Sequence, residues 1–487
     1  MLRAALVGFV SVLLPLVATA NEPALQERID SYVQSYVSTQ NFSGTILVSR
    51  DGAVVFARGY GLSDAAVRRP NVLWTRFHVA SMSMQFTAAA VLRLADAGKL
   101  SLDASVASII MDYPGGSAIS IRNLLVQNSG IADINDQPDY EALLKSHQTA
   151  ASLVARVRDL KPVHPAGGTY VREEHSAYNL LALIVEKQTG LSFRDAVQRL
   201  VFEPLAMRDS GIDDDDKLKG VAPVAKGYAP LGVFNLQPAE PIHWSAKTGS
   251  GSAYSTVIDE QKWVSSFSSG HFLSEANRAA LLNLSSRAGY GWFKTNSVRF
   301  SEPLYYMNGR APGFASAIVY LPQERLSIVV LSNIYASVTS DIGSDIAALA
   351  LGRPVQSPTI RTTPLTPEAL TGLDGSAFGF PADFYQPSAT LKLNVKGADV
   401  ALLWPNGDVS ALVPVSADHF IDRGYWVPVE VLRDPAGRVS GLKFDHFVGV
   451  RAANSTSDAA GIHTCSARCI LSRTLARFVQ TKTTELH

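Results

Sequence analysis

A serine at the start of an apolar helix is the feature that most constrains this chain of 487 residues. The segment from Phe77 to Thr87 reads FHVASMSMQFT, continues with apolar residues and closes with GKLSLD at 98–103. Because residues three apart share one face of a helix, Met84 is expected beside Ser81, one turn later. A serine hydroxyl is a weak nucleophile until a neighbouring base takes its proton, and a thioether is no base at neutral pH. The segment therefore predicts a helix that presents a serine without an adjacent base.

This segment resembles the nucleophile region of the serine β-lactamase, penicillin-binding protein and carboxylesterase superfamily, which reads F-x-x-A-S-x-x-K-x-F-T-A and later G-K-L-x-L-D. Three more segments resemble that superfamily in the same order: ISIRNLLVQNSGI at 119–131, FEPLAM at 202–207 and AYSTVID at 253–259. The resemblance covers about residues 27–350. It implies a β-lactamase/transpeptidase-like α/β fold with a mixed sheet, flanking helices and a helical lobe. In such proteins the position of Met84 holds a lysine base.

Two further catalytic positions of the superfamily carry other residues in this chain. The Y-x-N motif, placed by its spacing from Tyr178, corresponds to EEH at 173–175, and the K-T-G or H-x-G motif corresponds to MNG at 307–309. The three motifs are thus degenerate, reading S-x-x-M, E-E-H and M-N-G, and the usual bases and cationic substrate clamp are absent from their positions. The resemblance still implies an oxyanion hole formed by the backbone N–H groups of Ser81 and Arg310, because backbone donors survive side-chain replacement.

The residues that replace the Y-x-N motif are themselves candidates for catalysis. Alternate residues of an extended segment face the same way, so we expect Glu173 and His175 to point into the pocket and Glu174 outward. A histidine titrates near neutrality and acts as an acid or a base, and a neighbouring carboxylate can orient it. We therefore predict catalytic roles for Ser81, Glu173 and His175. The alternatives are a solvated loop without a chemical role and, for Ser81, a simple helix N-cap.

Four residues are predicted to line the substrate site: Met84 on the helix, and Asn308, Gly309 and Arg310 around the third motif. The guanidinium of Arg310 could bind a substrate carboxylate, and the alternative is an exposed turn residue. For Met84 the alternative is a core position, since apolar residues of helices are usually buried.

The N-terminus resembles a signal peptide. Arg3 precedes an apolar run at 4–17 and the cleavage pattern Ala18-Thr19-Ala20. The run is shorter than the roughly 20 residues of a membrane-spanning helix, which is the alternative. Beyond a Pro- and Thr-rich segment, short β-rich runs separated by turns resemble the small lipocalin-like domain that many members of the superfamily carry. The predicted division is a signal peptide at 1–20, a β-lactamase-like domain at 21–353, a linker at 354–367 and a β-rich domain at 368–487.

Composition limits the partners of the chain. Lys+Arg and Asp+Glu both number 43, so the zero net charge does not favour nucleic acid. We expect a periplasmic or secreted protein with a small-molecule substrate or ligand, no cofactor, no metal and no integral membrane segment after signal cleavage. Cys465 and Cys469 are predicted to form a disulfide in that oxidising compartment, with two free thiols as the alternative.

Three functions remain open from the sequence. The preferred one is a repurposed enzyme in which Glu173 and His175 perform acid–base chemistry on an ester, amide or isomerisable substrate, with or without Ser81. The second is a serine hydrolase with Ser81 as nucleophile and His175 as base. The third is a non-catalytic binding protein that uses the old pocket. The first is preferred because both positions hold ionisable residues rather than alanine or glycine.

Overall fold

The computed structural model describes most of the chain between residues 22 and 452. The described ranges are 22–170, 172–214, 218, 223–232, 235–282, 284, 287–297, 299–356, 364–384, 388–405 and 409–452. The predicted signal peptide and the predicted disulfide between Cys465 and Cys469 lie outside these residues, so both stay predictions.

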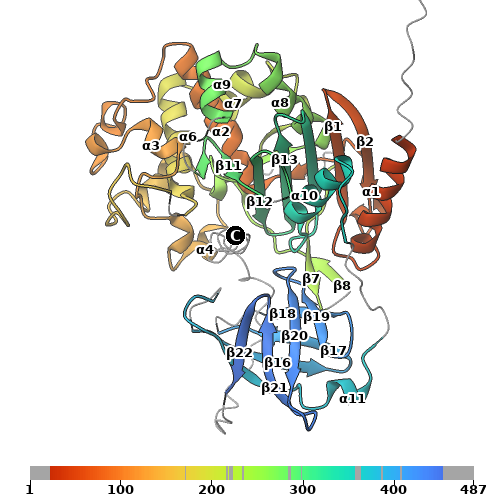
Figure 1. The fold of residues 1–487 in the computed structure, drawn as a ribbon. Coiled ribbons are helices and arrows are strands. Elements are labelled where there is room, and N and C mark those ends of the chain that lie inside the picture. Colours follow the sequence, from red (N-terminus) through yellow and green to blue (C-terminus); the bar gives the residue numbers. More distant parts are fainter. Residues whose placement is uncertain are drawn as a thin grey trace, which may run out of the picture.

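A seven-stranded antiparallel sheet forms the centre of the larger domain (Figure 1). Its order is β10-β11-β12-β13-β14-β1-β2. The strands are β1 (Gly44–Arg50), β2 (Ala53–Tyr60), β10 (Ala288–Gly289), β11 (Trp292–Thr295), β12 (Leu304–Ala311), β13 (Phe314–Leu321) and β14 (Leu326–Ser332). Strand β1 pairs with β14, with Gly44 opposite Ser332, so an N-terminal and a C-terminal strand of this domain are neighbours in the sheet. The turn at Asp51-Gly52 joins β1 to β2, and Asp-Gly is a residue pair that favours such hairpin turns.

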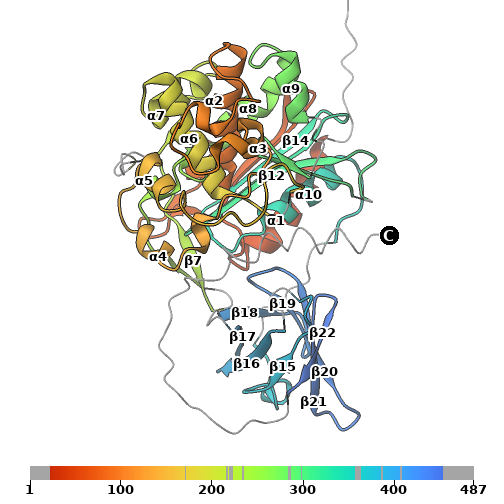
Figure 2. The ribbon, with the colours of Figure 1, turned by 90° about the vertical axis from the view of Figure 1, so that its left-hand side faces the viewer.

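Helices cover both faces of this sheet (Figure 2). On one face α10 (Thr339–Ala350) lies over β13 and β14, and α1 (Glu22–Val37) packs beside it. On the other face α8 (Val257–Ser269) packs on β1 and β14. Helices α2 (Met84–Asp96) and α6 (His175–Thr189) contact each other in the adjoining helical lobe. Thus α2, which follows Ser81, and α6, which begins at His175, are neighbouring helices.

Shorter elements complete the larger domain and the linker. The short helices are η1 (Ala80–Ser83), η2 (Val106–Ser108), η3 (Gly116–Ala118), α3 (Ile121–Leu125), η4 (Ile134–Asp136), α4 (Tyr140–Leu143), α5 (Ala150–Ala155), α7 (Phe193–Val197), η5 (Gln198–Phe202), η6 (Trp244–Lys247), α9 (Glu275–Leu282) and α11 (Pro367–Leu370). The short strands are β3 (Leu62–Asp64), β4 (Arg69–Pro70), β5 (Phe77–His78), β6 (Gly211–Ile212), β7 (Tyr228–Leu231), β8 (Asn235–Pro238) and β9 (Ala253–Ser255).

The C-terminal β-rich domain is a closed antiparallel barrel, drawn at the bottom of Figure 1. Its strands are β15 (Ala377–Gly379), β16 (Thr390–Lys396), β17 (Asp399–Leu403), β18 (Val409–Pro414), β19 (His419–Asp422), β20 (Pro428–Arg433), β21 (Val439–Phe444) and β22 (Phe447–Arg451). Side chains point alternately into the barrel and out to solvent along each strand. In β16, Leu391 and Leu393 are buried, whereas Thr390, Lys392 and Asn394 are exposed. The predicted architecture, an α/β domain with flanking helices and a helical lobe followed by a small β domain, is confirmed. The expectation of a mixed sheet is wrong, because every strand pair of the seven-stranded sheet is antiparallel.

One buried arginine of the barrel connects it to the larger domain. Arg423, just after β19, is 1% exposed. Its Nε donates to Oδ1 of Asn41 at 3.0 Å and its Nη2 to the carbonyl of Gln40 at 3.0 Å. Its Nη1 donates to the carbonyls of Asn235, at 3.2 Å, and Gly232. The last two acceptors belong to the β7–β8 hairpin, which points toward the barrel in both views (Figures 1 and 2).

An aromatic contact lies beside this arginine. The rings of Tyr36 in α1 and Trp426 after β19 are 5.3 Å apart between centroids. The two domains therefore share a joint with both polar and apolar contacts. Over the described ranges, no helix has the length and apolar character needed to cross a bilayer.

Candidate active site

Ser81 lies in the tight turn η1, directly before α2, and the backbone of this turn is strained. Ala80 has a φ of 50°, a left-handed conformation that costs an L-residue about 1–2 kcal/mol. The surroundings hold the turn in place: Oγ of Ser83 donates to the carbonyl of Ala80 at 2.7 Å and accepts from the backbone N–H of Ala253 at 2.8 Å. Strain that the surrounding structure fixes in this way is typical of functional sites.

Strand β12 approaches this turn at Gly309. A Cβ added to Gly309 would lie 2.2 Å from the carbonyl oxygen of Val79 and 2.8 Å from the backbone nitrogen of Ser81. Both neighbours are main-chain atoms and cannot rotate away, so only glycine fits at this position. The glycine that the family motif keeps is therefore required here by the close approach of two backbones.

The backbone of β12 also presents a donor next to Ser81. The pairing of β11 with β12 ends at Tyr306, whereas β12 continues along β13 to Ala311 opposite Phe314. Ala311 and Phe314 flank a two-residue turn and exchange its backbone hydrogen bonds. The next pair along the strands, Arg310 and Ala315, is therefore of the kind that is not hydrogen-bonded. The N–H of Arg310 consequently points away from β13, to the side of β12 that β11 has left open. The geometry fits the predicted oxyanion hole formed by Ser81 and Arg310 N–H groups.

The surroundings of the Ser81 hydroxyl are apolar. Met84 and Met307 are both 0% exposed, and they fill the positions of the lysine and of the first residue of the third motif. Within the part of the chain that the structure describes, no hydrogen bond joins Oγ of Ser81 to Glu173 or His175. The imidazole of His175 contacts Asp133 and Asn135 instead. Among the described residues, neither of the two predicted bases therefore activates the hydroxyl of Ser81 through a hydrogen bond.

The side chains of Asn308 and Arg310 lie on the opposite face of β12 from Ser81. Nδ2 of Asn308 donates to Oγ of Ser340 in α10 at 3.2 Å, and Nη2 of Arg310 donates to the carbonyl of Ser337 at 3.2 Å. Strand alternation explains this, because Gly309 between them faces Ser81. Their predicted substrate contacts therefore depend on the backbone of β12, and the guanidinium of Arg310 points away from the serine rather than lying in an exposed turn.

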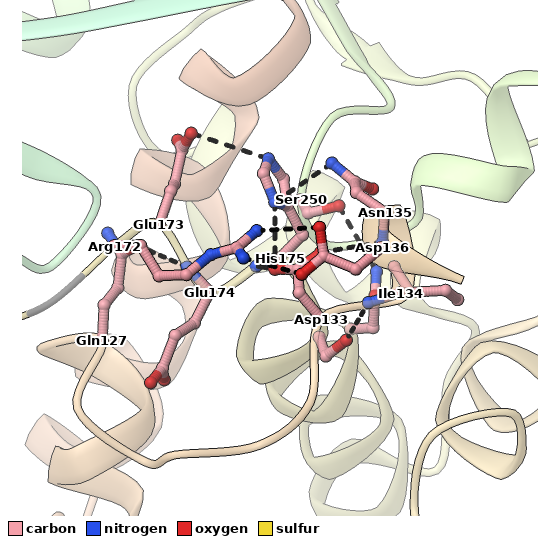
Figure 3. A network of polar contacts seen from close by, with 12 residues as sticks. Gln127, Asp133, Ile134, Asn135, Asp136, Arg172, Glu173, Glu174, His175 and Ser250 are labelled. Carbon is pink, nitrogen blue, oxygen red and sulfur yellow. Dashed lines mark hydrogen bonds and ion pairs between the residues drawn. The ribbon is translucent and has the colours of Figure 1, made fainter. Parts of the chain in front are cut away.

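Asp133, His175 and Glu173 form a line of polar contacts at the N-terminus of α6, the acid–base cluster (Figure 3). Oδ2 of Asp133 accepts the backbone N–H of His175 at 2.8 Å and lies 3.2 Å from its Nδ1. Nε2 of His175 lies 3.6 Å from Oε2 of Glu173. Both ring nitrogens thus face carboxylate oxygens, an arrangement that suits an imidazolium, which donates from both.

Exposure increases along the cluster. The side chain of Asp133 is 4% exposed, that of His175 is 14% exposed and that of Glu173 is 24% exposed. Glu173 is therefore the member whose carboxyl group an incoming molecule can reach, while Asp133 supports the imidazole from inside.

The three groups shift the pKa values of one another. Burial alone would lower the pKa of His175, but the negative charges of Asp133 and Glu173 outweigh it and raise the pKa. Burial raises the pKa of Glu173, against the opposing charge of His175. Burial also acts on Asp133, but His175 and the N–H of Asn135 hold its pKa below the usual range. Asp133 therefore stays ionised, His175 is favoured in its protonated form, and Glu173 can exchange a proton closer to neutral pH than a free carboxyl.

Local structure explains the position of Asp133, which the sequence analysis did not identify. Asp133 is the N-cap of η4, and its Oδ1 accepts the N–H of Asn135 at 2.8 Å. Arg172 anchors the neighbouring chain through Asp136, with contacts at 2.6 Å and 3.2 Å. Two signals were present in the sequence: Asp-x-Asn is typical of a helix cap, and the segment directly follows the NSGI motif at 128–131.

Glu174 does not face outward, and that expectation is wrong. Its side chain is 3% exposed. One carboxylate oxygen accepts the backbone N–H and Oγ–H of Ser129 at 3.0 Å and 2.7 Å, and the other accepts the N–H of Gly130 at 3.0 Å. Glu174 points away from Glu173 and His175, as alternation requires, but it enters the turn after α3. It fixes this loop in place rather than meeting solvent.

A metal centre finds no support in the described ranges, where no three His, Cys, Asp or Glu side chains are grouped to hold an ion. The acid–base cluster is held together by its own hydrogen bonds and ion pairs.

A family model described as "Beta-lactamase" matches residues 29–352 of this chain. The "Putative penicillin-binding protein PbpX" of Bacillus subtilis (strain 168) is 24% identical over 302 residues, covering 62% of this chain and 73% of that protein. "Protein flp" of Staphylococcus aureus (strain COL) is 25% identical over 335 residues, covering 63% of each chain, so this chain spans less than two thirds of that relative.

Solved structures extend the comparison into the barrel. The octameric penicillin-binding protein homologue from Pyrococcus abyssi has a TM-score of 0.60 with 22% identity, covering 87% of this chain and 99% of that chain. At this identity the likeness shows the fold alone.

Proposed function

Because the chain belongs to the beta-lactamase family, we propose that it is an enzyme of this fold in which Glu173, supported by His175 and Asp133, performs the acid–base step. The substrate is a small molecule with an ester, amide or isomerisable bond. The observation that carries the proposal is the line of contacts from Asp133 through His175 to Glu173, which the neighbouring backbone fixes at the N-terminus of α6.

The roles follow from the geometry of the cluster. Ionised Glu173 accepts a proton from an attacking water or from a carbon next to a carbonyl, and protonated Glu173 returns it to the leaving group or to carbon. The protonated imidazole of His175 stabilises the ionised carboxylate, and Asp133 keeps the imidazole oriented. The backbone N–H groups of Ser81 and Arg310 stabilise negative charge that develops on the carbonyl oxygen. None of these steps requires a deprotonated Ser81.

A serine hydrolase with Ser81 as nucleophile is the second candidate. The strained φ of Ala80 and the close approach of Gly309 to Ser81 favour it, because both features preserve the shape of a nucleophile turn. In this candidate His175 or Glu173 would need to move to hydrogen-bonding distance of Oγ when substrate binds. The two candidates differ in whether a covalent acyl group forms on Ser81.

The test begins with a screen of the purified protein against esters, lactones and D-amino-acid amides. On any substrate that is turned over, Glu173→Gln is compared with Glu186→Gln, the same change near the far end of α6, where the carboxyl group accepts the N–H of Phe193. We expect the first variant to lose activity and the second to keep it, with equal melting temperatures. Full activity in Glu173→Gln would refute the proposal. Intact mass spectrometry during turnover detects or excludes an acyl group on Ser81.

β-Lactams serve as a separate class of test compound. Met84, Glu173 and Met307 stand where the family keeps its lysine, tyrosine and basic or imidazole group. We therefore expect no productive turnover of penicillins or cephalosporins. Hydrolysis of a chromogenic cephalosporin that Ser81→Ala abolishes would contradict this expectation.

Export to the periplasm or the exterior is part of the proposal and rests on the N-terminal pattern. Detection of the mature N-terminus after Ala20 in the exported protein would support it, and an uncleaved cytoplasmic product would count against it. If the screen finds no substrate, a non-catalytic binding protein becomes the leading function.

A further inference from the structure

A lysine and a tyrosine from two distant segments meet beside the acid–base cluster. Lys247 is the last residue of η6, and Tyr140 is the first residue of α4. Nζ of Lys247 donates to Oη of Tyr140 at 2.6 Å and lies 5.3 Å from the centroid of its ring. Tyr140 is 7% exposed, and Lys247 is half-buried. The side chains therefore form a defined pair rather than a mobile surface lysine.

Backbone contacts place this pair next to the cluster. The turn after Lys247 is bound to α6, since Nδ2 of Asn179 donates to the carbonyl of Thr248 at 2.6 Å, one helical turn beyond His175. Ser250, on the same turn, is among the residues drawn with the cluster in Figure 3. Tyr140 follows directly on the η4 segment that supplies Asp133. The positive charge of Lys247 in addition lowers the pKa values of both Glu173 and His175, as a minor contribution.

The ammonium group has donors to spare. Among the described residues, no carboxylate lies within ion-pair distance of Nζ, and its hydrogen bond goes to a neutral phenol. The other cation at the cluster, Arg172, is bound to Asp136 through two contacts. Since the phenol oxygen accepts from Lys247, its own proton is free to be donated. The hydrogen bond thus places an N–H donor group and an O–H donor group 2.6 Å apart.

We propose that Lys247 and Tyr140 form an anion-binding subsite and that the substrate carries a carboxylate next to the bond on which Glu173 acts. The chemistry follows from the donors: a carboxylate accepts one hydrogen bond from each, and its charge is balanced by the ammonium. The inference rests on the proposed function for the identity of the reacting bond. It adds a substrate class, namely small acyl compounds with a free carboxylate.

Binding is measured without turnover, so that this inference and the proposed function can fail separately. The probes are N-acetylglycine, which has a carboxylate, and N-acetylglycinamide, its neutral counterpart. Isothermal titration at low ionic strength compares the wild type with Lys247→Gln, Tyr140→Phe and the control Lys187→Gln, an exposed lysine in the last turn of α6. Melting temperatures check folding, and Tyr140→Phe keeps the ring and its packing if Lys247→Gln is unstable.

In the wild type we expect N-acetylglycine to bind at millimolar concentration and the neutral probe to bind at least about tenfold more weakly, the minimum for a lost charged hydrogen bond. Lys247→Gln should remove the difference between the probes, Tyr140→Phe should reduce it, and Lys187→Gln should leave it unchanged. Equal binding of both probes to the wild type, no binding of N-acetylglycine, or a preference that survives in Lys247→Gln would overturn the inference. A Lys247-dependent preference in a protein that turns over no substrate would leave the subsite standing and reject the proposed function.

Discussion

The two sides of the candidate active site differ in what holds them. Around Ser81 the contacts are made by the main chain: Gly309 meets the backbone of Val79 and Ser81, and Ser83 ties the turn to Ala253. Around His175 the contacts are made by side chains that carry charge. A turn fixed by its backbone can keep its shape after a catalytic side chain such as the lysine is lost. The serine side therefore keeps a turn that belongs to the fold, and the proposed chemistry rests on the acid–base cluster.

The two sides also differ in where their titratable groups lie. On the serine side the acid next to α2 is Glu260, which is 0% exposed and bound to Nε2 of Gln85 at 3.1 Å. Gln85 is held in turn by Nε1 of Trp263 at 2.7 Å. Glu260 is buried in the core, whereas the side chain of Glu173 is partly exposed. A shifted pKa thus serves catalysis only where a substrate can reach the group.

The largest expected effect comes from breaking the acid–base cluster as a unit. Glu173→Gln and His175→Ala should each lower kcat/KM by about 10²–10⁴-fold, because general acid–base groups contribute that much. The double variant should be little worse than either single variant, since groups that act together are strongly non-additive. Steady-state kinetics of the three variants on one substrate decide this. Multiplicative losses would mean that the two residues act independently.

The buried acid on the serine side should affect stability instead of rate. Burial raises the pKa of Glu260 from 4.5 to about 8. When folding raises the pKa of a carboxyl, the protonated group contributes its full stability at pH values below the pKa of the unfolded chain. This contribution is lost as the pH rises from about 4.5, the unfolded pKa, to about 8, the folded pKa. Glu260→Gln should therefore gain stability relative to the wild type at about pH 9, by up to about 4 kcal/mol, and little at about pH 4.

Urea unfolding of both proteins across this pH range measures the difference. A stability difference between variant and wild type that is the same at every pH would show that folding does not raise the pKa of the Glu260 carboxyl. Its kcat/KM should not change, because the group has no access to the pocket.

A lysine introduced at position 84 should not by itself produce esterase activity. Met84→Lys puts an ammonium into a site that is 0% exposed, and we expect a loss of about 3 kcal/mol in the free energy of unfolding from desolvation. Esterase activity should stay at the wild-type level because the tyrosine and the third-motif cation remain absent. Met84→Leu controls for the change in packing. A marked gain in esterase activity would mean that the serine side needs only its base.

Removing the inner carboxylate should alter the imidazole more than the fold. In Asp133→Asn the pKa of His175 should fall, because the charge that raises it most is gone. Histidine resonances followed by NMR across the pH range measure this directly. Activity should drop by roughly tenfold, as for the loss of a group that only orients another. An unchanged histidine titration would show that Asp133 acts only through the backbone N–H of His175.

The smallest effect is expected on the serine side itself. Ser81→Ala keeps the backbone N–H that contributes to the oxyanion hole, so kcat/KM should fall by less than about tenfold. Steady-state kinetics measure the change, with Ser105→Ala as the matched control, a half-buried serine before η2 whose side chain makes no capping hydrogen bond. Complete loss of turnover in Ser81→Ala alone would transfer the catalytic role from the cluster to the serine.

Local sequence signals predicted the elements that carry the site. The pair Asp51-Gly52 between two apolar runs is a sequence signal for the first hairpin. Gly190, at a φ of 68°, ends α6, and glycine is the residue that most often takes this conformation after a helix. Alternation also brought Glu173 and His175 to one side, as the structure has them. These signals act within a few residues along the chain, which is why they are visible in the sequence.

Contacts between distant segments could not be predicted in the same way. Asp133 meets His175 across 42 positions, and Tyr140 meets Lys247 across 107, and no periodicity connects such pairs. Alternation correctly placed Glu174 on the side opposite Glu173 and His175. It could not show that the loop at Ser129 and Gly130, rather than solvent, lies on that side. Asn308 and Arg310 could have been assigned to the far face of β12, since the same alternation places them opposite Gly309.

The joint made by Arg423 has a consequence for how the chain unfolds. Its guanidinium is matched by uncharged oxygens from both the N-terminal segment and the β7–β8 hairpin. If the barrel were cut off at the linker, the carbonyls of Gln40 and Asn235 would lose donors that water must replace, and Tyr36 would lose the ring of Trp426. Neither part can therefore melt without disturbing the surface of the other. We therefore expect the larger domain and the barrel to be thermodynamically coupled, so denaturation should follow one cooperative transition rather than two.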